Sequence, residues 1–193
     1  MPNEIVALRI PLSRFKHTRK HRRTLRKCAP LRTEVVPART DIVRRRLFRE
    51  HATRFADTAP DTLHHFITAS PDFDPVRCLE VDVYAGAELV AASYFNVGAA
   101  ATSAVYCMWK LAWRWYELGT FTLLKEIEWG IQAGMQYHYT GYGHVCPSFY
   151  DYKLEFGPFE WLETAAAEKG RRDEEPFRAR REQGSESRPS DSN

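Results

Sequence analysis

Long apolar runs and paired cysteines are both missing from this 193-residue sequence. No stretch approaches the ~18 uninterrupted apolar residues of a membrane-spanning helix, so we expect a protein without a membrane partner. The start of the chain also lacks the apolar segment of a secretory signal. The four cysteines stand far apart and form no C-x-x-C pair, which favours reduced thiols in the cytoplasm over a disulfide framework or a metal site. They are Cys28, Cys78, Cys107 and Cys146.

Acidic residues are missing from one long basic segment. Residues 9–32, RIPLSRFKHTRKHRRTLRKCAPLR, contain ten Lys or Arg side chains and no Asp or Glu. Residues 1–69 carry 16 basic against 6 acidic side chains, whereas residues 70–164 carry 5 against 12. This asymmetry suggests a polyanionic partner for one face of the molecule. The basic segment is either a solvated arm or a surface that contacts phosphate groups, because Arg pairs with phosphate oxygens and Lys adds point charge.

Hydrophobic periodicity predicts a mixed α/β domain. Period-2 alternation predicts a short strand at 5–10 and, further on, three strands whose short connections favour an antiparallel meander. A helix should then begin with Thr120 as its N-cap and end at Gly134, and a tyrosine-rich strand should follow it beside the third strand of the meander. The predicted elements are a helix over 41–55, strands over 79–84, 89–96 and 102–108, a helix over 120–133 and a strand over 136–142.

The same periodicity predicts which side chains are buried. On the helix over 41–55 the arginines should point largely away from the apolar stripe. On the helix over 120–133 the apolar face should include Ile131, while Glu126 and Glu128 should lie on the solvent-exposed face. In the first meander strand Glu80 and Asp82 alternate with apolar residues, which is typical of a half-buried strand.

Composition divides the chain into three parts. Residues 1–35 should form a basic N-terminal arm with the first strand, and residues 36–164 the α/β domain. Residues 165–193 are charged, rich in Ser and Pro, and contain Phe177 as their one large apolar side chain. Such a segment cannot bury enough apolar surface to offset its conformational entropy, so we expect a disordered tail.

Four stretches, in order along the chain, carry a resemblance to a known family: FKHTRKHRRTLRK, ATSAVYCMW, LGTFTLLKEIEWGIQAGMQYHYTGY and CPSFYDYKLEFGPFEWL. Together they cover about residues 10 to 162 and resemble the C-terminal domain of the arginyl- and leucyl-tRNA–protein transferases. The order of elements is also that of acyl-CoA N-acyltransferase (GNAT) domains. The resemblance therefore implies a GNAT-like α/β fold with a mixed, mainly antiparallel sheet flanked by helices.

Three features differ from the family pattern. The family's N-terminal region with clustered cysteines, which binds zinc or an iron–sulfur cluster, has no counterpart in this sequence. Asn96 stands where the family usually has an aspartate, and MWKLAW replaces a Tyr-Asp-Pro sequence. These differences bear on which aminoacyl group the chain would recognise.

The resemblance implies transfer of arginine or leucine from aminoacyl-tRNA to the N-terminal α-amine of an acceptor protein. It requires no metal and no cofactor beyond aminoacyl-tRNA as co-substrate. The residues expected to line the catalytic pocket are Tyr106, Tyr139, Tyr142 and His144. The residues expected to bind tRNA or substrate are Arg19, Lys20, Arg22, Arg23, Asn96, Gly119, Thr120, Tyr152 and Lys153.

Alternatives remain open at each of these points. The tyrosines could equally form a partly buried aromatic cluster with satisfied hydroxyls, and Gly119-Thr120 could simply start a helix. Two other functions are compatible with the fold. The first is an N-acyltransferase using acyl-CoA, although RWYELGTF lacks the Q/R-x-x-G-x-G/A pattern that cradles its pyrophosphate. The second is a tRNA-binding homologue without catalytic activity. The sequence leaves the oligomeric state undetermined.

The cysteine spacing leads to a direct test. The purified protein should contain no stoichiometric zinc or iron, because isolated cysteines do not supply the clustered ligands of a structural metal site. Elemental analysis is the measurement. A content of about one metal ion per chain would contradict the prediction and indicate ligands brought together from distant parts of the sequence.

Overall fold

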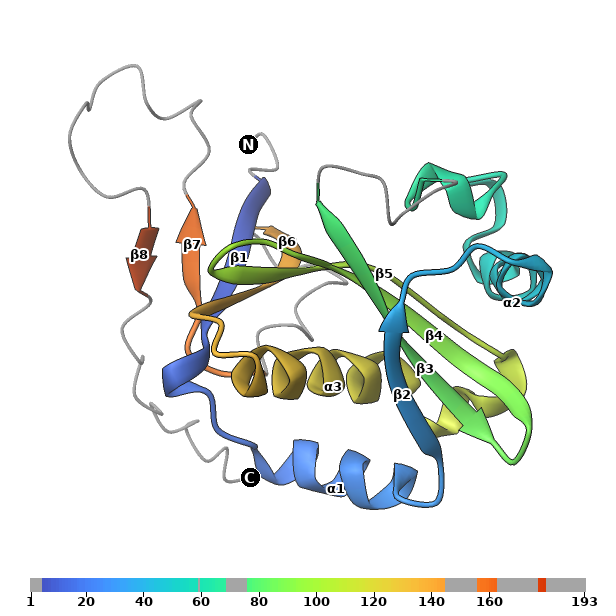
Figure 1. Cartoon of the computed structure of the whole chain (residues 1–193), viewed down its shortest axis with the longest axis horizontal. Helices are drawn as coiled ribbons and strands as arrows, with labels where there is room; N and C mark the ends of the chain where they lie inside the picture. Colours follow the sequence, from blue (N-terminus) through green and yellow to red (C-terminus); the bar gives the residue numbers. More distant parts are fainter. Residues whose placement is uncertain (1–4, 59, 69–75, 145–155, 163–176, 180–193) are drawn as a thin grey trace, which may run out of the picture.

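The computed structural model describes residues 5–58, 60–68, 76–144, 156–162 and 177–179. Its centre is an eight-stranded sheet with the order β2-β3-β4-β5-β6-β1-β7-β8 (Figure 1). Neighbouring strands are antiparallel except for the parallel pair β5–β6. The strands are β1 (Ile5–Pro11), β2 (Arg32–Pro37), β3 (Arg77–Ala85), β4 (Glu88–Val97), β5 (Ala101–Trp109), β6 (Tyr137–His144), β7 (Glu160–Leu162) and β8 (Phe177–Ala179).

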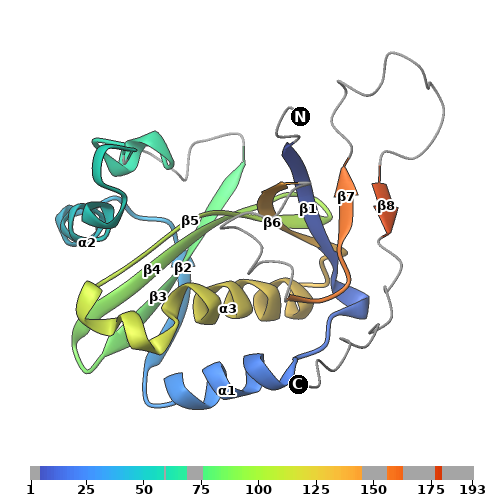
Figure 2. The same cartoon turned by 180° about the vertical axis from the view of Figure 1, so that it is seen from behind.

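Helices cover both faces of the sheet. Helices α1 (Arg19–Cys28) and α3 (Leu118–Gln132) lie side by side on one face, and α2 (Ile42–Ala52) packs on the other (Figures 1 and 2). None of the helices in the described part of the chain combines the length and apolarity that crossing a membrane requires. Four short 3-10 segments complete the connections: η1 (Leu12–Arg14), η2 (Thr53–Thr58), η3 (Leu63–His65) and η4 (Leu111–Tyr116).

The predicted sheet is confirmed. Strands β3, β4 and β5 form the antiparallel meander, and the turn between β3 and β4 contains Gly86 with a positive φ of 61°. Helix α3 then carries the chain across the sheet and ends before Gly134, whose φ of 72° favours glycine. Strand β6 lies beside β5 as expected, and β1 pairs with β6 along its whole length. The mixed, mainly antiparallel α/β fold is therefore correct.

The start and the exposed face of α3 differ from the prediction. The helix begins at Leu118, and its N-cap is Glu117 in the left-handed region with φ 54°, so Thr120 lies inside the first turn and is not the cap. The side chain of Ile131 is 45% exposed, although the periodicity placed it on the apolar face. The preceding residue, Gly130, is buried instead and lies close to Leu12 and Thr102.

Helix α2 begins as predicted with Asp41, which accepts hydrogen bonds from the backbone N–H groups of Val43 and Arg44. The prediction for its arginines is wrong at Arg44, whose side chain is buried against β3. Its guanidinium donates to Glu80 at 2.8 Å, and it also pairs with Asp82.

Strand β3 is consequently buried on both faces rather than half-buried. Glu80 and Asp82 are fully buried beneath α2, where Arg39 also donates to both carboxylates, at 2.8 and 2.6 Å. Two carboxylates on one strand face are tolerated there because two guanidinium groups neutralise them. A period-2 pattern cannot show that a charged partner from another element will cover the polar face.

The first of the two domain boundaries predicted from composition falls within a strand, and the second lies outside the described residues. The boundary at residue 35 lies inside β2, and β1 and α1 contribute to the same sheet and core as the later elements. Of the predicted disordered tail, the structure describes only Phe177–Ala179, which pair with β7 as strand β8. The remainder of that tail lies outside the described residues.

The buried ion pairs under α2 lead to a stability prediction. Changing Arg44 to Ala should lower the free energy of unfolding by about 3–5 kcal/mol, because it removes one of the two guanidinium groups that neutralise the buried Glu80 and Asp82 and leaves Arg39 alone beside them. The exposed Arg45 on the same helix is the matched control, and Arg45→Ala should change stability by less than about 0.5 kcal/mol. Urea denaturation measures both. Equal stability of the two variants would show that Glu80 and Asp82 are satisfied without Arg44.

Candidate functional site

Strands β5 and β6 share only a short hydrogen-bonded contact. They are paired at three positions, from Ala101 opposite Tyr137 to Ser103 opposite Tyr139. Beyond these positions β5 continues beside β4, whereas β6 continues beside β1 (Figure 1). The described ladder between the two strands therefore stops one third of the way along β5, and the sheet is interrupted at this place.

A cluster of buried polar side chains lies where the two strands part. Glu126 of α3 accepts a hydrogen bond at Oε1 from Ser93 of β4. Its other oxygen, Oε2, lies 3.6 Å from Nε2 of His138 on β6. The second ring nitrogen of His138, Nδ1, is 2.7 Å from the hydroxyl of Thr102 on β5. One carboxyl group thus connects α3 with three adjacent strands, and the predicted exposed position of Glu126 is wrong.

Burial controls the charge of this cluster. It raises the pKa of Glu126 to about 8, against the opposing effect of the Ser93 hydrogen bond, and it lowers the pKa of His138 to about 3. Both groups are therefore neutral near pH 7. Glu126 Oε2 and His138 Nε2 face each other at 3.6 Å, beyond hydrogen-bond distance, and neither atom has a hydrogen-bond partner in the described part of the chain. A protonated carboxyl opposite a neutral imidazole places no charge in this buried site.

Two of the described cysteines, Cys28 and Cys107, are unsuited to nucleophilic chemistry. Burial raises the pKa of Cys107 to about 12 and that of Cys28 to about 11, so both remain thiols at neutral pH. The Cys107 sulfur lies 3.2 Å from the Thr122 hydroxyl, next to the Glu126 cluster. Among the described residues, no group of three or more His, Cys, Asp or Glu side chains is arranged to hold a metal ion.

The predicted pocket residues belong to separate groups. Tyr106 stacks on Phe66 with 4.1 Å between ring centroids and contacts Phe48 on the α2 side of the sheet, and burial raises its pKa to about 12. Tyr139 interacts with Arg9, whose guanidinium donates to Glu160 at 2.8 Å.

Four further predicted residues are only partly described or not described. Tyr142 and His144 lie on β6 opposite β1, and their side chains are outside the described structure, as are Tyr152 and Lys153 altogether. The pocket assignment therefore stays a prediction, and so do the assignments of Tyr152 and Lys153.

The other predicted substrate-binding residues occupy two places. Asn96 is half-buried on β4, opposite Cys78 and Ser103. Gly119 and Thr120 lie in the first turn of α3, where backbone N–H groups precede the first intrahelical hydrogen bond, from Phe121 to Glu117. The carboxylate of Glu117 accepts from the Thr24 hydroxyl of α1 at 2.7 Å, and this bond joins the two helices at that turn.

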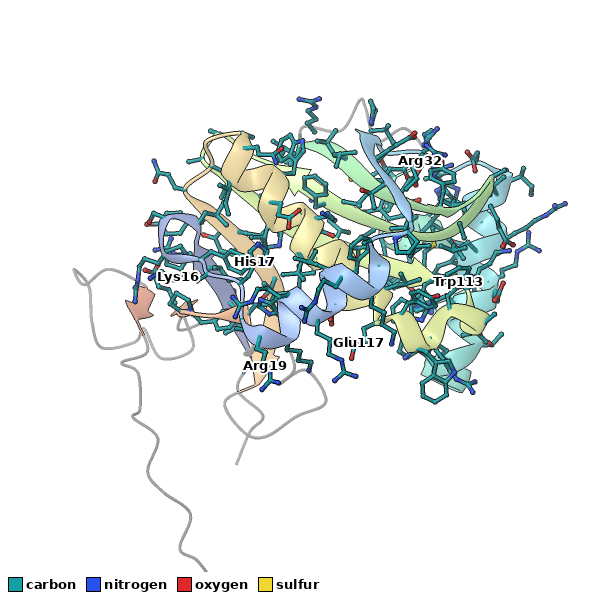
Figure 3. The ribbon with its side chains drawn as sticks, turned by 90° about the horizontal axis from the view of Figure 1, so that it is seen from below. Lys16, His17, Arg19, Arg32, Trp113 and Glu117 are labelled. Carbon is teal, nitrogen blue, oxygen red and sulfur yellow. The ribbon has the colours of Figure 1, made fainter. Side chains whose placement is uncertain are left out.

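Helix α1 presents a basic face to solvent. Thr18 caps it in a reciprocal arrangement with His21, and the residues that turn towards the core are His21, Thr24 and Cys28. The predicted phosphate-binding residues are all exposed on the outer face: Arg19, Lys20, Arg22 and Arg23. Figure 3 views the molecule from this side, with Arg19 at the start of the helix and Glu117 beside its C-terminal half.

Comparison with known proteins identifies the family. The family model for the C terminus of arginine-tRNA-protein transferase matches residues 43–163. The chain belongs to this family. The matched range extends from α2 through the meander and α3 to β7, so it includes the interrupted sheet and the buried Glu126 cluster.

Curated relatives of this transferase family are aspartate/glutamate leucyltransferases. The relative from Stenotrophomonas maltophilia is 29% identical over 163 residues, covering 80% of this chain and 65% of the relative. The relative from Helicobacter hepaticus is 25% identical over 173 residues, covering 83% of this chain and 69% of the relative. The chain thus spans about two thirds of the length of the curated relatives it matches.

Solved structures with a similar fold are more distant. One is a C-terminal domain (DUF2156) assigned to a lysylphosphatidylglycerol synthetase of Agrobacterium fabrum, with a TM-score of 0.52, 14% identity and coverage of 74% of this chain and 48% of that chain. Another is L-PGS from Bacillus licheniformis, with a TM-score of 0.53, 14% identity and coverage of 79% and 50%. At this identity the likeness extends to the fold alone.

Sequence reasoning missed the Glu126 cluster. The available signal was the burial period of α3, since Thr122, Glu126 and Gly130 are spaced four residues apart and follow one line along the helix. Small residues at 122 and 130 leave room for a longer side chain between them. In β6, alternation places His138 and Thr140 on the inner face, between tyrosines that face outward.

The neutral state of Glu126 leads to a pH prediction. Its pKa in the folded protein lies above the ordinary value of 4.5, so its contribution to stability is complete below pH 4.5 and is lost as pH rises to about 8. His138 has a lowered pKa, so its contribution is lost only as pH falls below 6.5. Between pH 6.5 and 8, wild-type protein should therefore lose about 2 kcal/mol of unfolding free energy through Glu126.

The variant Glu126→Gln cannot titrate and should lack this part of the pH dependence. Urea denaturation of both proteins at pH 6.5, 7.25 and 8 measures the difference. Glu128→Gln, on the same helix at a half-exposed position paired with Lys125, should keep the wild-type slope. Parallel slopes for wild type and Glu126→Gln would mean that Glu126 is ionised in the folded protein.

Proposed function

We propose that this chain is an aminoacyl-tRNA–protein transferase that moves an amino acid from tRNA to the N-terminal α-amine of an acceptor protein. The observation that carries the proposal is the family match across residues 43–163, which contain the interrupted sheet. The names of the curated relatives favour leucine over arginine as the transferred residue and acceptors that begin with aspartate or glutamate. The exposed basic face of α1 supports a role in binding tRNA phosphates.

The chemistry makes limited demands on the protein. The acceptor amine attacks the carbonyl carbon of the aminoacyl ester, a peptide bond forms, and the ribose oxygen leaves with a proton. The ester is already activated, so placement of the two substrates and stabilisation of the developing oxyanion supply most of the catalysis. An α-amine with a pKa of about 8 is partly neutral at physiological pH, so a weak base suffices to remove its proton.

The thiols and backbone N–H groups are compatible with transfer of the amino acid from tRNA to the acceptor amine without a covalent enzyme intermediate. The buried thiols of Cys28 and Cys107 stay protonated, so a thioester intermediate on either residue is disfavoured. Backbone N–H groups in the first turn of α3, at Gly119 and Thr120, are suitably polarised to face a developing negative charge. We further propose that the protein acts in the cytoplasm and needs no cofactor besides aminoacyl-tRNA.

A transfer assay tests the function. Purified full-length chain would be mixed with radiolabelled leucyl-tRNA or arginyl-tRNA and with peptides that differ only in the first residue. We expect label on peptides that begin with aspartate or glutamate, and none on acetylated versions of the same peptides. Binding of tRNA without transfer would instead identify a non-catalytic homologue, and labelling by acyl-CoA would identify an N-acyltransferase.

The basic face of α1 leads to a salt-dependence prediction. If Arg22 and Arg23 contact phosphates, replacing both by alanine should flatten the slope of log affinity against log salt by about 1.4 on a single strand or about 1.8 on a duplex. All tRNAs should be weakened alike, because phosphate contacts carry little sequence information. Both residues are exposed, so the thermal midpoint should stay unchanged.

The double variant Arg45→Ala and Arg46→Ala removes the same charge from α2, on the opposite face of the sheet. It should leave the salt slope close to that of wild type. Filter binding over a salt series measures all three proteins. If both double variants flatten the slope equally, binding follows net charge and α1 is not the specific tRNA surface.

A further inference from the structure

We propose that the exposed indole of Trp115 is a stacking site for an unpaired base at the single-stranded 3′ end of tRNA. This inference rests on the proposed function. It concerns a segment, η4, to which neither the composition nor the predicted site residues assign a role. The segment connects β5 with α3, and its last residue, Tyr116, lies two positions before α3 begins.

Trp115 is presented to solvent from an anchored segment. Its side chain is 69% exposed, the largest value among the large apolar residues described. Its neighbours Trp113 and Tyr116 are partly buried against the core and contact each other, with 4.8 Å between ring centroids. In a 3-10 segment, residues three apart share one face, so Trp113 and Tyr116 hold the backbone while Trp115 points away from them. The backbone that carries the exposed ring is therefore anchored by Trp113 and Tyr116.

One cation lies against this ring and another contacts its backbone. The guanidinium carbon of Arg114 lies 4.8 Å from the centre of the Trp115 ring. The ammonium group of Lys27, at the end of α1, donates to the backbone carbonyl of Trp115. This bond joins η4 to the basic helix α1, on which Arg23 and Arg26 are exposed.

An aromatic face at the end of a basic surface is the combination that binds single-stranded nucleic acid. The cations follow the phosphate backbone, and the ring stacks on a base whatever its identity. A single indole beside cations is much smaller than the contiguous apolar patch that marks a protein interface, and its surroundings are polar. An unpaired base offers the flat, neutral partner that fits it, whereas a base within a duplex has no free face.

The position of Trp115 also suits the 3′ end of a charged tRNA. Two residues separate it from Leu118, where α3 begins and where backbone N–H groups of the first turn have no intrahelical acceptor. A base held on Trp115 would keep the terminal ribose and its ester near that turn. Phosphates further from the end would then lie along α1.

A binding cycle tests the site. Wild-type protein and Trp115→Ala would each be titrated with deacylated tRNA and with the same tRNA trimmed of its unpaired 3′ nucleotides. Trp115→Ala should weaken binding of intact tRNA by roughly 5- to 150-fold, the range for loss of one stacked base. It should leave binding of trimmed tRNA unchanged within about 2-fold, because the base that stacks is absent.

Two variants guard against indirect effects. Trp115→Phe keeps an aromatic face and should retain most of the affinity for intact tRNA. Ile131→Ala removes another exposed apolar side chain, at the far end of α3, and should behave as wild type with both tRNAs. Thermal melting of every variant confirms that each is folded.

Each failure has a distinct meaning. Equal weakening of intact and trimmed tRNA by Trp115→Ala would overturn the stacking site, and so would no weakening of either. Loss of affinity for an acidic acceptor peptide, with tRNA binding unchanged, would overturn it and assign the indole to the acceptor. Each of these outcomes would overturn the stacking site while the wild-type protein still transfers the amino acid, so the proposed function would stand. If wild-type protein binds neither tRNA, the proposed function fails together with the inference.

Discussion

The parallel contact between β5 and β6 holds the two halves of the sheet together. One half contains β2 to β5 and the other contains β6, β1, β7 and β8, and only three paired positions join them. So short a ladder contributes little by itself, since parallel pairing is slightly weaker per residue than antiparallel pairing. Helix α3 compensates, because it packs against residues of both halves. The shape of the interrupted sheet therefore depends on what lies between this helix and the strands.

The buried Glu126 cluster lies at this junction. Ser93, Thr102 and His138 belong to three adjacent strands, and the carboxyl group of α3 contacts two of them. Apolar side chains would fill the same space, but they would not define the spacing of the strands as closely as directional hydrogen bonds do. A polar network whose members are neutral avoids most of the cost of burying charge. We infer that the cluster holds β5 and β6 together at their short ladder, where Thr102 and His138 are paired.

Much of the fold could be predicted from the sequence because its signals are local. Alternation in residues 79–84 and 89–96, the turn at Gly86 and the stop at Gly134 each act within a few residues. The errors at Arg44 and Glu126 occurred where a distant partner decides the outcome. Arg44 is buried because it pairs with the carboxylates of Glu80 and Asp82 on β3. Glu126 is buried because Ser93 and His138 supply polar contacts. No window along one element contains that information.

The predicted site divides in the same way. The exposure of the basic side chains named on α1 follows from a segment without acidic residues, and all four lie on the outer face. The helix itself was not predicted, since the segment was expected to form an arm. The predicted tyrosine pocket depended on which strand faces which helix, and Tyr106 and Tyr139 have separate sets of partners. Trp115 was overlooked because a tryptophan in sequence usually signals core.

The central place of β1 has a consequence for biosynthesis. This strand is made early, yet it lies between β6 and β7, and its Arg9 bonds to Glu160, 151 residues later. As the chain leaves the ribosome from its N-terminus, β1 has no partner until nearly all of the domain has been translated. Contacts so far apart in sequence also make folding slow. During synthesis the chain therefore carries β1 without its neighbouring strands until β6 and β7 have been made.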